Sequence, residues 1–157
     1  METPPTLRIV IDHIDGSRRG QRQELACGPR IRFGRHPDCE ITFDAHRDLD
    51  ASSRHAELRQ GDDRFVLVDT GSSNGTFVGG ERIAELDVPV GAPIEVEFGA
   101  GGPRLRLLVG DDAQVAALPR LETTSSRALP GRRRALWLVG LVALVALLGL
   151  LGWRLAG

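Results

Sequence analysis

The chain has 157 residues, enough for one domain of ordinary size with extensions, and its net charge is −1 at pH 7. Residues 1–110 carry 14 Arg and 18 acidic side chains, a net charge of −4, whereas residues 111–157 carry 6 Arg and 3 acidic ones, a net charge of +3. A mildly acidic globular part argues against nonspecific nucleic-acid binding, which needs a basic face, so we expect no nucleic-acid partner.

Apolar residues recur with a period of two from Leu7 to Val109, and this alternation is typical of half-buried β-strands. Clusters of Gly, Pro, Asp, Asn and Ser separate the alternating segments at short intervals. Such spacing predicts an all-β antiparallel sandwich or barrel within residues 1–110. The predicted strands include 7–11, 31–33, 56–58, 65–68, 77–78, 94–98 and 105–109.

The pattern changes after Gly110. Residues 111–134 lack β alternation, contain Pro119 and Pro130 and end in an Arg-rich run, which predicts a flexible linker. A single helical turn over residues 113–118 is the alternative for the start of this segment.

Residues 135–153 are 19 uncharged positions dominated by Leu, Val, Ala and Gly. As a helix this segment is about 28 Å long, close to the hydrocarbon thickness of a bilayer, and we predict a single transmembrane helix. The basic run Arg132–Arg134 faces only Arg154 on the other side, in the tail 154–157. The positive-inside rule therefore predicts a single-pass, tail-anchored protein of the inner or plasma membrane, with its N-terminal domain in the cytoplasm.

Three short stretches contain groups that suit a phosphate: Gly34-Arg35, the run 52–55 (Ser-Ser-Arg-His) and the run 72–76 (Ser-Ser-Asn-Gly-Thr). Each lies at the end of a predicted strand, so one rim of a sandwich can carry all three. A guanidinium donates paired hydrogen bonds to phosphate oxygens, and hydroxyl and amide groups add further donors. No nucleophile–base pair, nucleotide-binding loop or metal-ligand spacing accompanies them, so we predict no enzyme activity, no cofactor and no metal.

The order and spacing of these stretches resemble the forkhead-associated (FHA) domain, an eleven-strand β-sandwich that binds phosphothreonine peptides. The resemblance covers about residues 7–109 and implies five ligand contacts. Arg35 and the Ser52 hydroxyl would contact the phosphate, and Ser53 would add a second phosphate contact. Ser73 would line the site, and Asn74 would hold the peptide main chain.

By the same resemblance, Gly34, His55, Gly75 and Thr76 would support the loops. His55 is more readily explained as such a scaffold than as a catalyst, and for Arg54 a solvated position is at least as well supported as a ligand contact. The chain departs from the family at Gly79-Gly80, where Asn-Gly is usual. Cys27 and Cys39 lack metal-ligand spacing and are expected to be reduced, structural thiols.

The function implied is a phosphothreonine-binding adaptor at the cytoplasmic face of the membrane, in Ser/Thr kinase signalling. The alternative is a structural FHA-like scaffold of a membrane-embedded, secretion-type complex without phosphate dependence. The run Glu122-Thr123-Thr124-Ser125 also resembles the kinase-target segment in the tails of small actinobacterial FHA regulators. Thr123 and Thr124, with a preference for Thr124, are therefore candidate phosphorylation sites whose phosphate would bind the chain's own rim.

Overall fold

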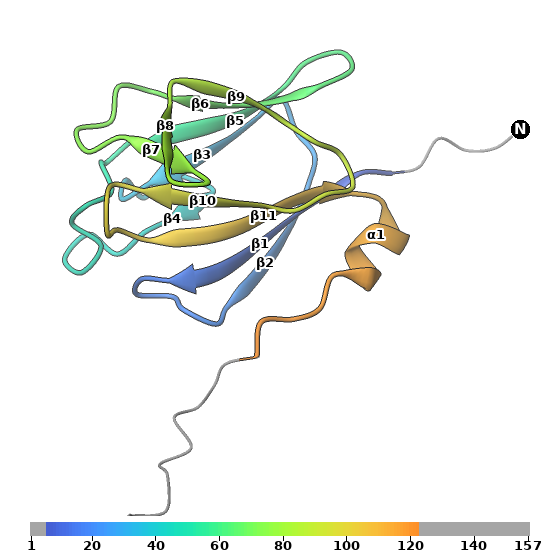
Figure 1. Cartoon of the computed structure of the whole chain (residues 1–157), viewed down its shortest axis with the longest axis horizontal. Coiled ribbons are helices and arrows are strands. Elements are labelled where there is room, and N and C mark those ends of the chain that lie inside the picture. The colour runs from blue at the N-terminus through green and yellow to red at the C-terminus, as the bar shows by residue number, and fades with distance from the viewer. Residues whose placement is uncertain (1–5, 123–157) are drawn as a thin grey trace, which may run out of the picture. The chain divides into compact units, whose positions relative to one another are not determined.

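The structure is a computed structural model that describes residues 6–122. Eleven strands are followed by one short helix in this part of the chain (Figure 1). The elements are β1 (Arg8–Asp15), β2 (Arg22–Ala26), β3 (Arg30–Gly34), β4 (Ile41–Thr42), β5 (Ala56–Gln60), β6 (Phe65–Asp69), β7 (Thr76–Val78), β8 (Glu81–Ile83), β9 (Glu85–Val88), β10 (Ile94–Phe98), β11 (Arg104–Gly110) and α1 (Asp112–Ala117). The predicted all-β class and its strand segments are confirmed.

The strands form two sheets. One sheet has six strands in the order β2-β1-β11-β10-β7-β8, and the other has five in the order β4-β3-β5-β6-β9. The named pairs are antiparallel except β3 and β4, which run parallel. The tight hairpin between β7 and β8 turns at Gly79-Gly80, whose φ angles are 60° and 83°. Two consecutive positive φ angles are what a two-residue hairpin of this kind requires, so glycine at both positions suits the turn.

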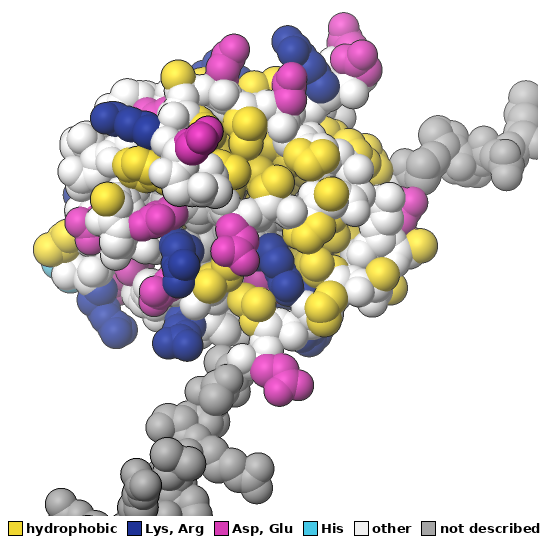
Figure 2. Space-filling view, in the orientation of Figure 1, with side chains coloured by type: hydrophobic (Ala, Val, Ile, Leu, Met, Phe, Trp, Pro, Cys, Tyr) yellow, Lys and Arg dark blue, Asp and Glu magenta, His cyan; other side chains and the backbone are white. Residues whose placement is uncertain are grey.

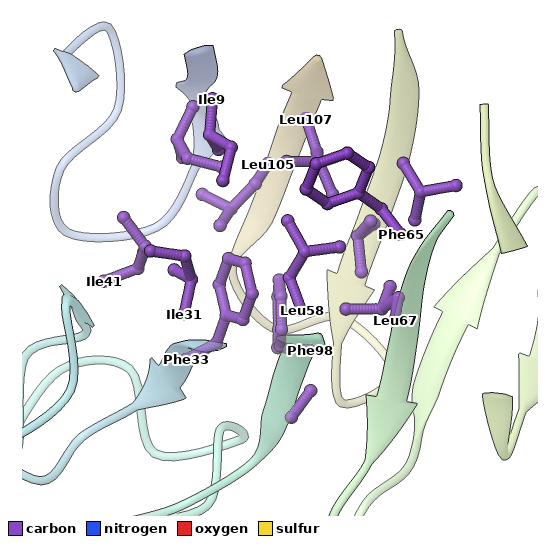
Figure 3. Close-up of a cluster of buried hydrophobic side chains, with 14 of the residues drawn as sticks. Ile9, Ile31, Phe33, Ile41, Leu58, Phe65, Leu67, Phe98, Leu105 and Leu107 are labelled. Carbon is purple, nitrogen blue, oxygen red and sulfur yellow. The ribbon is translucent and has the colours of Figure 1, made fainter. Parts of the chain in front are cut away.

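The hydrophobic core lies between the two sheets. Alternate residues of facing strands supply it, and Figure 3 shows side chains from both sheets meeting there, including Ile9, Phe33, Leu58, Phe98 and Leu107. The rings of Phe33 and Phe98 stack with centroids 5.3 Å apart. Because this layer holds strands of both sheets at fixed positions, the loops at the strand ends start from a rigid base.

At the start of the predicted linker the structure agrees with the alternative, a helical turn over 113–118, since residues 112–117 form α1. The Asp111 side chain accepts the Gln114 amide and the Gln114 side chain accepts the Asp111 amide, a capping box that fixes the first turn. Val115 is buried against Val10 and Leu108 on the outer face of the six-stranded sheet. Six residues are too few for a stable isolated helix, so this packing stabilises α1, and sequence periodicity alone gave only a weak signal.

A buried charge cluster holds the chain beyond α1. The Asp12 carboxylate is 2% exposed and accepts hydrogen bonds from the guanidinium groups of both Arg22 and Arg106. Both arginines also donate to the Pro119 carbonyl, at 3.2 and 2.6 Å. The segment as far as Pro119 is therefore fastened to the sheet.

No helix within residues 6–122 is long and apolar enough to cross a membrane. The predicted transmembrane helix 135–153, the tail 154–157 and the candidate phosphorylation sites Thr123 and Thr124 lie outside the described residues.

Candidate functional site

The three sequence stretches meet at one end of the sandwich. Gly34 ends β3, residues 52–55 lead into β5, and residues 70–75 connect β6 to β7. Figure 1 shows these connections at the left, at the end opposite α1. We call this end the loop rim; it comprises residues 34–36, 43–55 and 70–75. The predicted site residues are thus brought together.

Arg35 is fixed by neutral groups of the β4–β5 loop. Its Nε donates to the Ala51 carbonyl at 2.6 Å, and one terminal nitrogen donates to the Ala45 carbonyl at 3.0 Å. Its main-chain amide donates to the Ser52 carbonyl at 3.1 Å. Neither side-chain partner carries a formal charge, so the charge of the guanidinium is oriented but not neutralised. The remaining N–H groups are donors for an anion.

Gly34 allows this close pairing. A Cβ atom at position 34 would lie 2.2 Å from the Ser53 carbonyl oxygen. Any side chain there would therefore push the β4–β5 loop away from the main chain of Arg35 and His36, whose amides donate to the carbonyls of Ser52 and Ser53. Glycine is required at this point by the close approach of two backbone segments.

Direct hydrogen bonds join the β4–β5 and β6–β7 loops. The Ser73 amide donates to the Ser52 hydroxyl oxygen at 3.0 Å, which leaves the hydroxyl proton of Ser52 for a ligand. The Asn74 side-chain amide donates to the Asp50 carbonyl at 3.0 Å. Ser73 and Asn74 are exposed, as a ligand-binding role requires, and Ser52 is half-buried beside them.

Ser53 and Arg54 also lie at the rim with exposed side chains. Arg54 is 63% exposed and its only ion pair within residues 6–122 is a 3.8 Å contact with Asp38. A contact of this length at the surface contributes little energy. Arg54 is therefore available to a ligand, but nothing in the described structure fixes its orientation.

His55 lies beneath the rim and is fully buried. Its Nδ1 accepts the Ser52 amide at 2.9 Å, and its Nε2 donates to the Gly75 carbonyl at 3.0 Å. This pair of bonds requires the neutral imidazole with its proton on Nε2, and burial lowers the pKa of His55 below its ordinary value. A buried ring that bridges two loops has no access to a ligand, which supports the scaffold interpretation.

Asp69 organises the β6–β7 loop, and sequence reasoning missed it. One carboxylate oxygen accepts the amides of Gly71 and Ser72, both at 2.8 Å. The other accepts the hydroxyls of Ser72 at 2.6 Å and Thr76 at 2.7 Å. Burial raises the pKa of the Asp69 carboxyl, but these hydrogen bonds outweigh burial and lower it overall. The run Asp-Thr-Gly-Ser is a sequence signal for such an aspartate turn.

Gly75 and Thr76 complete the support of the rim. Gly75 has φ +85°, and its carbonyl accepts the Gly99 amide at 2.8 Å in addition to His55. Thr76 is fully buried, and its hydroxyl donates to Asp69. These contacts fix the turn that presents Ser73 and Asn74.

Within residues 6–122 no group of three or more His, Cys, Asp or Glu side chains is placed to hold a metal ion. Cys39 is 5% exposed, and burial raises the pKa of its thiol. The rim therefore offers hydrogen-bond donors and one oriented positive charge. Such an arrangement suits an anionic, phosphate-like group, and the described rim residues include no nucleophile with an activating base.

Comparison with known proteins gives one family: the FHA domain model matches residues 31–97. The oxoglutarate dehydrogenase inhibitor of Corynebacterium diphtheriae is 47% identical over 79 residues, which are 50% of this chain and 52% of that protein. The glycogen accumulation regulator GarA of Mycolicibacterium smegmatis is 38% identical over 82 residues, 52% of this chain and 48% of GarA. The chain thus matches about half the length of these relatives.

Solved structures show the same fold. The FHA-1 domain of Mycobacterium tuberculosis Rv1747 superimposes with a TM-score of 0.54 at 22% identity, covering 67% of this chain and 98% of that one. An FHA domain of Arabidopsis thaliana gives a TM-score of 0.56 at 22% identity, covering 71% of this chain and 92% of that one. At this level of identity the similarity concerns the fold alone.

Proposed function

We propose that this chain, whose residues 31–97 match the FHA domain model, binds phosphothreonine-containing proteins through the loop rim and acts as an adaptor in Ser/Thr kinase signalling. A kinase or a kinase substrate is the expected partner. The relatives named above are an inhibitor and a regulator, which agrees with a protein that binds without catalysing a reaction.

The observation that carries the proposal is the state of Arg35. Two main-chain carbonyls hold its guanidinium, and no carboxylate within residues 6–122 forms an ion pair with it. Ser52, Ser73 and Asn74 lie on the two loops that hydrogen bonds join beside it. A phosphate adds a charge of about −1.5 to −2 and three acceptor oxygens, and it matches this set of donors, whereas an unmodified threonine does not.

Fluorescence anisotropy of the full chain in mild detergent, against a phosphothreonine peptide library, tests this function. Phosphoserine and unphosphorylated peptides serve as ligand controls. We expect micromolar binding that requires the phosphate and falls about 100-fold in Arg35→Ala, since the paired, charge-assisted bonds are lost. Arg64→Ala, whose side chain is 67% exposed outside the rim, is the matched control. Absence of phosphate-dependent binding would reject the function and leave the scaffold alternative.

We further propose that residues 135–153 tether this domain to the cytoplasmic face of the membrane. The support is in the sequence: 19 uncharged, mainly aliphatic residues preceded by Arg132–Arg134. Tethering raises the local concentration of bound partners, so a micromolar domain suffices. Alkaline carbonate extraction of membranes, with protease digestion of intact spheroplasts, provides the test. We expect the chain to resist extraction and its FHA domain to resist the protease; release into the supernatant would contradict the tether.

Thr123 and Thr124 are proposed as kinase targets that supply an internal ligand for the rim. The support is in the sequence, where the run Glu122-Thr123-Thr124-Ser125 resembles the kinase-target segment of small FHA regulators. Phosphopeptide mapping after treatment with the host Ser/Thr kinase should find a phosphate at one of the two, and this form should no longer bind the phosphothreonine peptide. Unmodified threonines would exclude the idea.

A further inference from the structure

The β4–β5 loop is organised around a second buried carboxylate, that of Asp48, which is 6% exposed. Its Oδ1 accepts the Ser17 amide at 2.9 Å. Its Oδ2 accepts the Ser17 hydroxyl and, at 2.9 Å, the Asp44 amide. Asp48 therefore joins the β1–β2 hairpin, which contains Ser17, to the loop that precedes β5.

Only a carboxylate satisfies this set of donors. The two main-chain amides point at different oxygens, so both oxygens must accept. An asparagine amide has one accepting oxygen and one donating nitrogen, and one of the two amides would then face another donor. A buried N–H without an acceptor is costly, and the loop would move to relieve it.

The loop residues around Asp48 supply the partners of Arg35. The Asp48 amide donates to the Asp44 carbonyl, and the Ala51 amide donates to the Asp48 carbonyl, both at 3.1 Å. These turns place the carbonyls of Ala45 and Ala51, which accept from the Arg35 guanidinium. The chain of contacts thus runs from Ser17 to Asp48, through the loop, to the charge at the rim.

The hairpin is shaped for this contact. Gly16 has φ +102°, and a Cβ atom there would lie 3.1 Å from Asp48 Oδ1. A side chain at position 16 would be strained and would crowd the carboxylate. Glycine at this turn therefore lets the Ser17 amide approach Asp48 closely.

We propose that Asp48 and Ser17 are positioning residues for phosphate recognition: they set the orientation of the Arg35 guanidinium through the β4–β5 loop, without contact to the ligand. The proposal rests on the proposed function of the rim. It assigns to the β1–β2 hairpin, which lies outside the stretch that matches the family model, a role in ligand affinity.

The test compares the full chain with Asp48→Asn, Ser17→Ala and Ser17→Thr. Val115→Ala is the control, because it removes methyl groups from the cluster at α1 and leaves the loop intact. Affinity for a phosphothreonine peptide is measured where urea unfolding shows every variant to be folded. We expect about tenfold weaker binding in Asp48→Asn, which is about 1.4 kcal/mol. Ser17→Ala should lose less affinity than Asp48→Asn. Ser17→Thr, which keeps the hydroxyl, and Val115→Ala should both bind as the unmodified chain does.

A second readout needs no ligand. The Nε–H of Arg35 donates to the Ala51 carbonyl, so its NMR resonance, assigned with Arg35→Lys, should be protected from solvent exchange. Asp48→Asn should abolish this protection, and Val115→Ala should keep it. A protected resonance and full affinity in Asp48→Asn would overturn the inference. If the unmodified chain binds no phosphopeptide, the proposed function fails, and loss of protection in Asp48→Asn would still support the positioning of Arg35.

Discussion

Arginines at the loop rim and on the outer face of the six-stranded sheet have opposite electrostatic environments. Arg22 and Arg106 share the buried Asp12 carboxylate and donate their other hydrogen bonds to chain carbonyls. Among the residues that the structure describes, the side chain of Arg35 has only neutral carbonyl partners. The first two therefore stabilise the fold, whereas the third keeps a charge that an anion can use. The partners of an arginine, which the tertiary structure sets, therefore distinguish a residue that stabilises the fold from one that offers its charge to an anion.

Several surface arginines of the described residues have a carboxylate partner. On the face turned to the viewer in Figure 2, basic and acidic side chains lie near one another rather than in a patch of one sign. Surface pairs such as Arg32 with Glu40 and Arg8 with Glu24 are examples from the described residues. Exposed pairs contribute little to stability. Arg35 differs from these arginines because two main-chain carbonyls orient its guanidinium.

Removing the carboxylate from the buried charge cluster of Asp12, Arg22 and Arg106 should have the largest effect on stability. Asp12→Asn leaves the guanidiniums of Arg22 and Arg106, 11% and 15% exposed, without their carboxylate. We expect the free energy of unfolding to fall by about 3 kcal/mol in urea denaturation, because a buried charge loses its partner. The same change at Asp112, 77% exposed, should cost under about 0.5 kcal/mol. Equal losses in both variants would mean that Asp12 is not the stabilising partner.

Lowering the pH should reduce the stability of the fold through His13 and His55 before it protonates Asp12. Burial lowers the pKa of His13 and of His55, so below pH 6.5 the unfolded chain binds protons that the folded chain does not. Stability is therefore complete above pH 6.5 and falls as the pH drops, by up to about 1.4 kcal/mol per pH unit for each histidine. Urea unfolding at pH 7, 6 and 5 measures the slope. His13→Gln should make this slope shallower, whereas the exposed His46→Gln control should leave it unchanged.

Between pH 7 and 5 the contribution of the buried Asp12 carboxylate to stability should not change. Burial raises the pKa of Asp12, but the bonds from Arg22 and Arg106 outweigh it and lower the pKa below 3.8. Its contribution is therefore present above that value and is lost only as the pH falls further. A slope between pH 7 and 5 that disappears in Asp12→Asn would contradict the assignment to the histidines.

Shortening the Val115 side chain in α1 tests whether the outer face of the six-stranded sheet and the loop rim are independent. Val115→Ala removes buried methyl groups from the contact with Val10 and Leu108 and should lower the free energy of unfolding by about 1.5 kcal/mol. Val90→Ala, at a position 48% exposed, is the control and should change it little. Phosphopeptide affinity should be the same in both. A fall in affinity with Val115→Ala would show that the sheet face and the rim are coupled.

Arg35→Lys sharpens the comparison by keeping the charge and changing its geometry. An ammonium cannot donate to the carbonyls of Ala45 and Ala51 and at the same time form a paired bond to phosphate. We expect about tenfold weaker peptide binding by anisotropy, about 1.4 kcal/mol. Arg64→Lys, outside the rim, should bind normally. Unchanged affinity in Arg35→Lys would show that charge alone, and not orientation, determines recognition.

Local patterns in the sequence predicted the sandwich because its strands alternate cleanly. The segments 31–33 and 105–109 carry apolar side chains at every second position, and both are strands. The rim stretches were found because their residue types are unusual at strand ends. Asp48 and Asp69 were missed, since each acts through hydrogen bonds to loop amides, and for Asp48 the partner Ser17 is 31 residues away. For residues 113–118 the sequence left a linker and a helical turn open, because the stability of α1 depends on its contact with the sheet.

Strand periodicity and turn chemistry are local properties, so the class of fold, the residues that suit a phosphate and their places at strand ends could be predicted before folding was considered. The tertiary structure decided which arginine keeps its charge, which carboxylates shape the loops, and where the folded domain ends after α1. These depend on pairs such as Arg106 with Asp12, 94 residues apart, and Arg35 with Ala51. Only the packed sheets bring such groups within hydrogen-bonding distance.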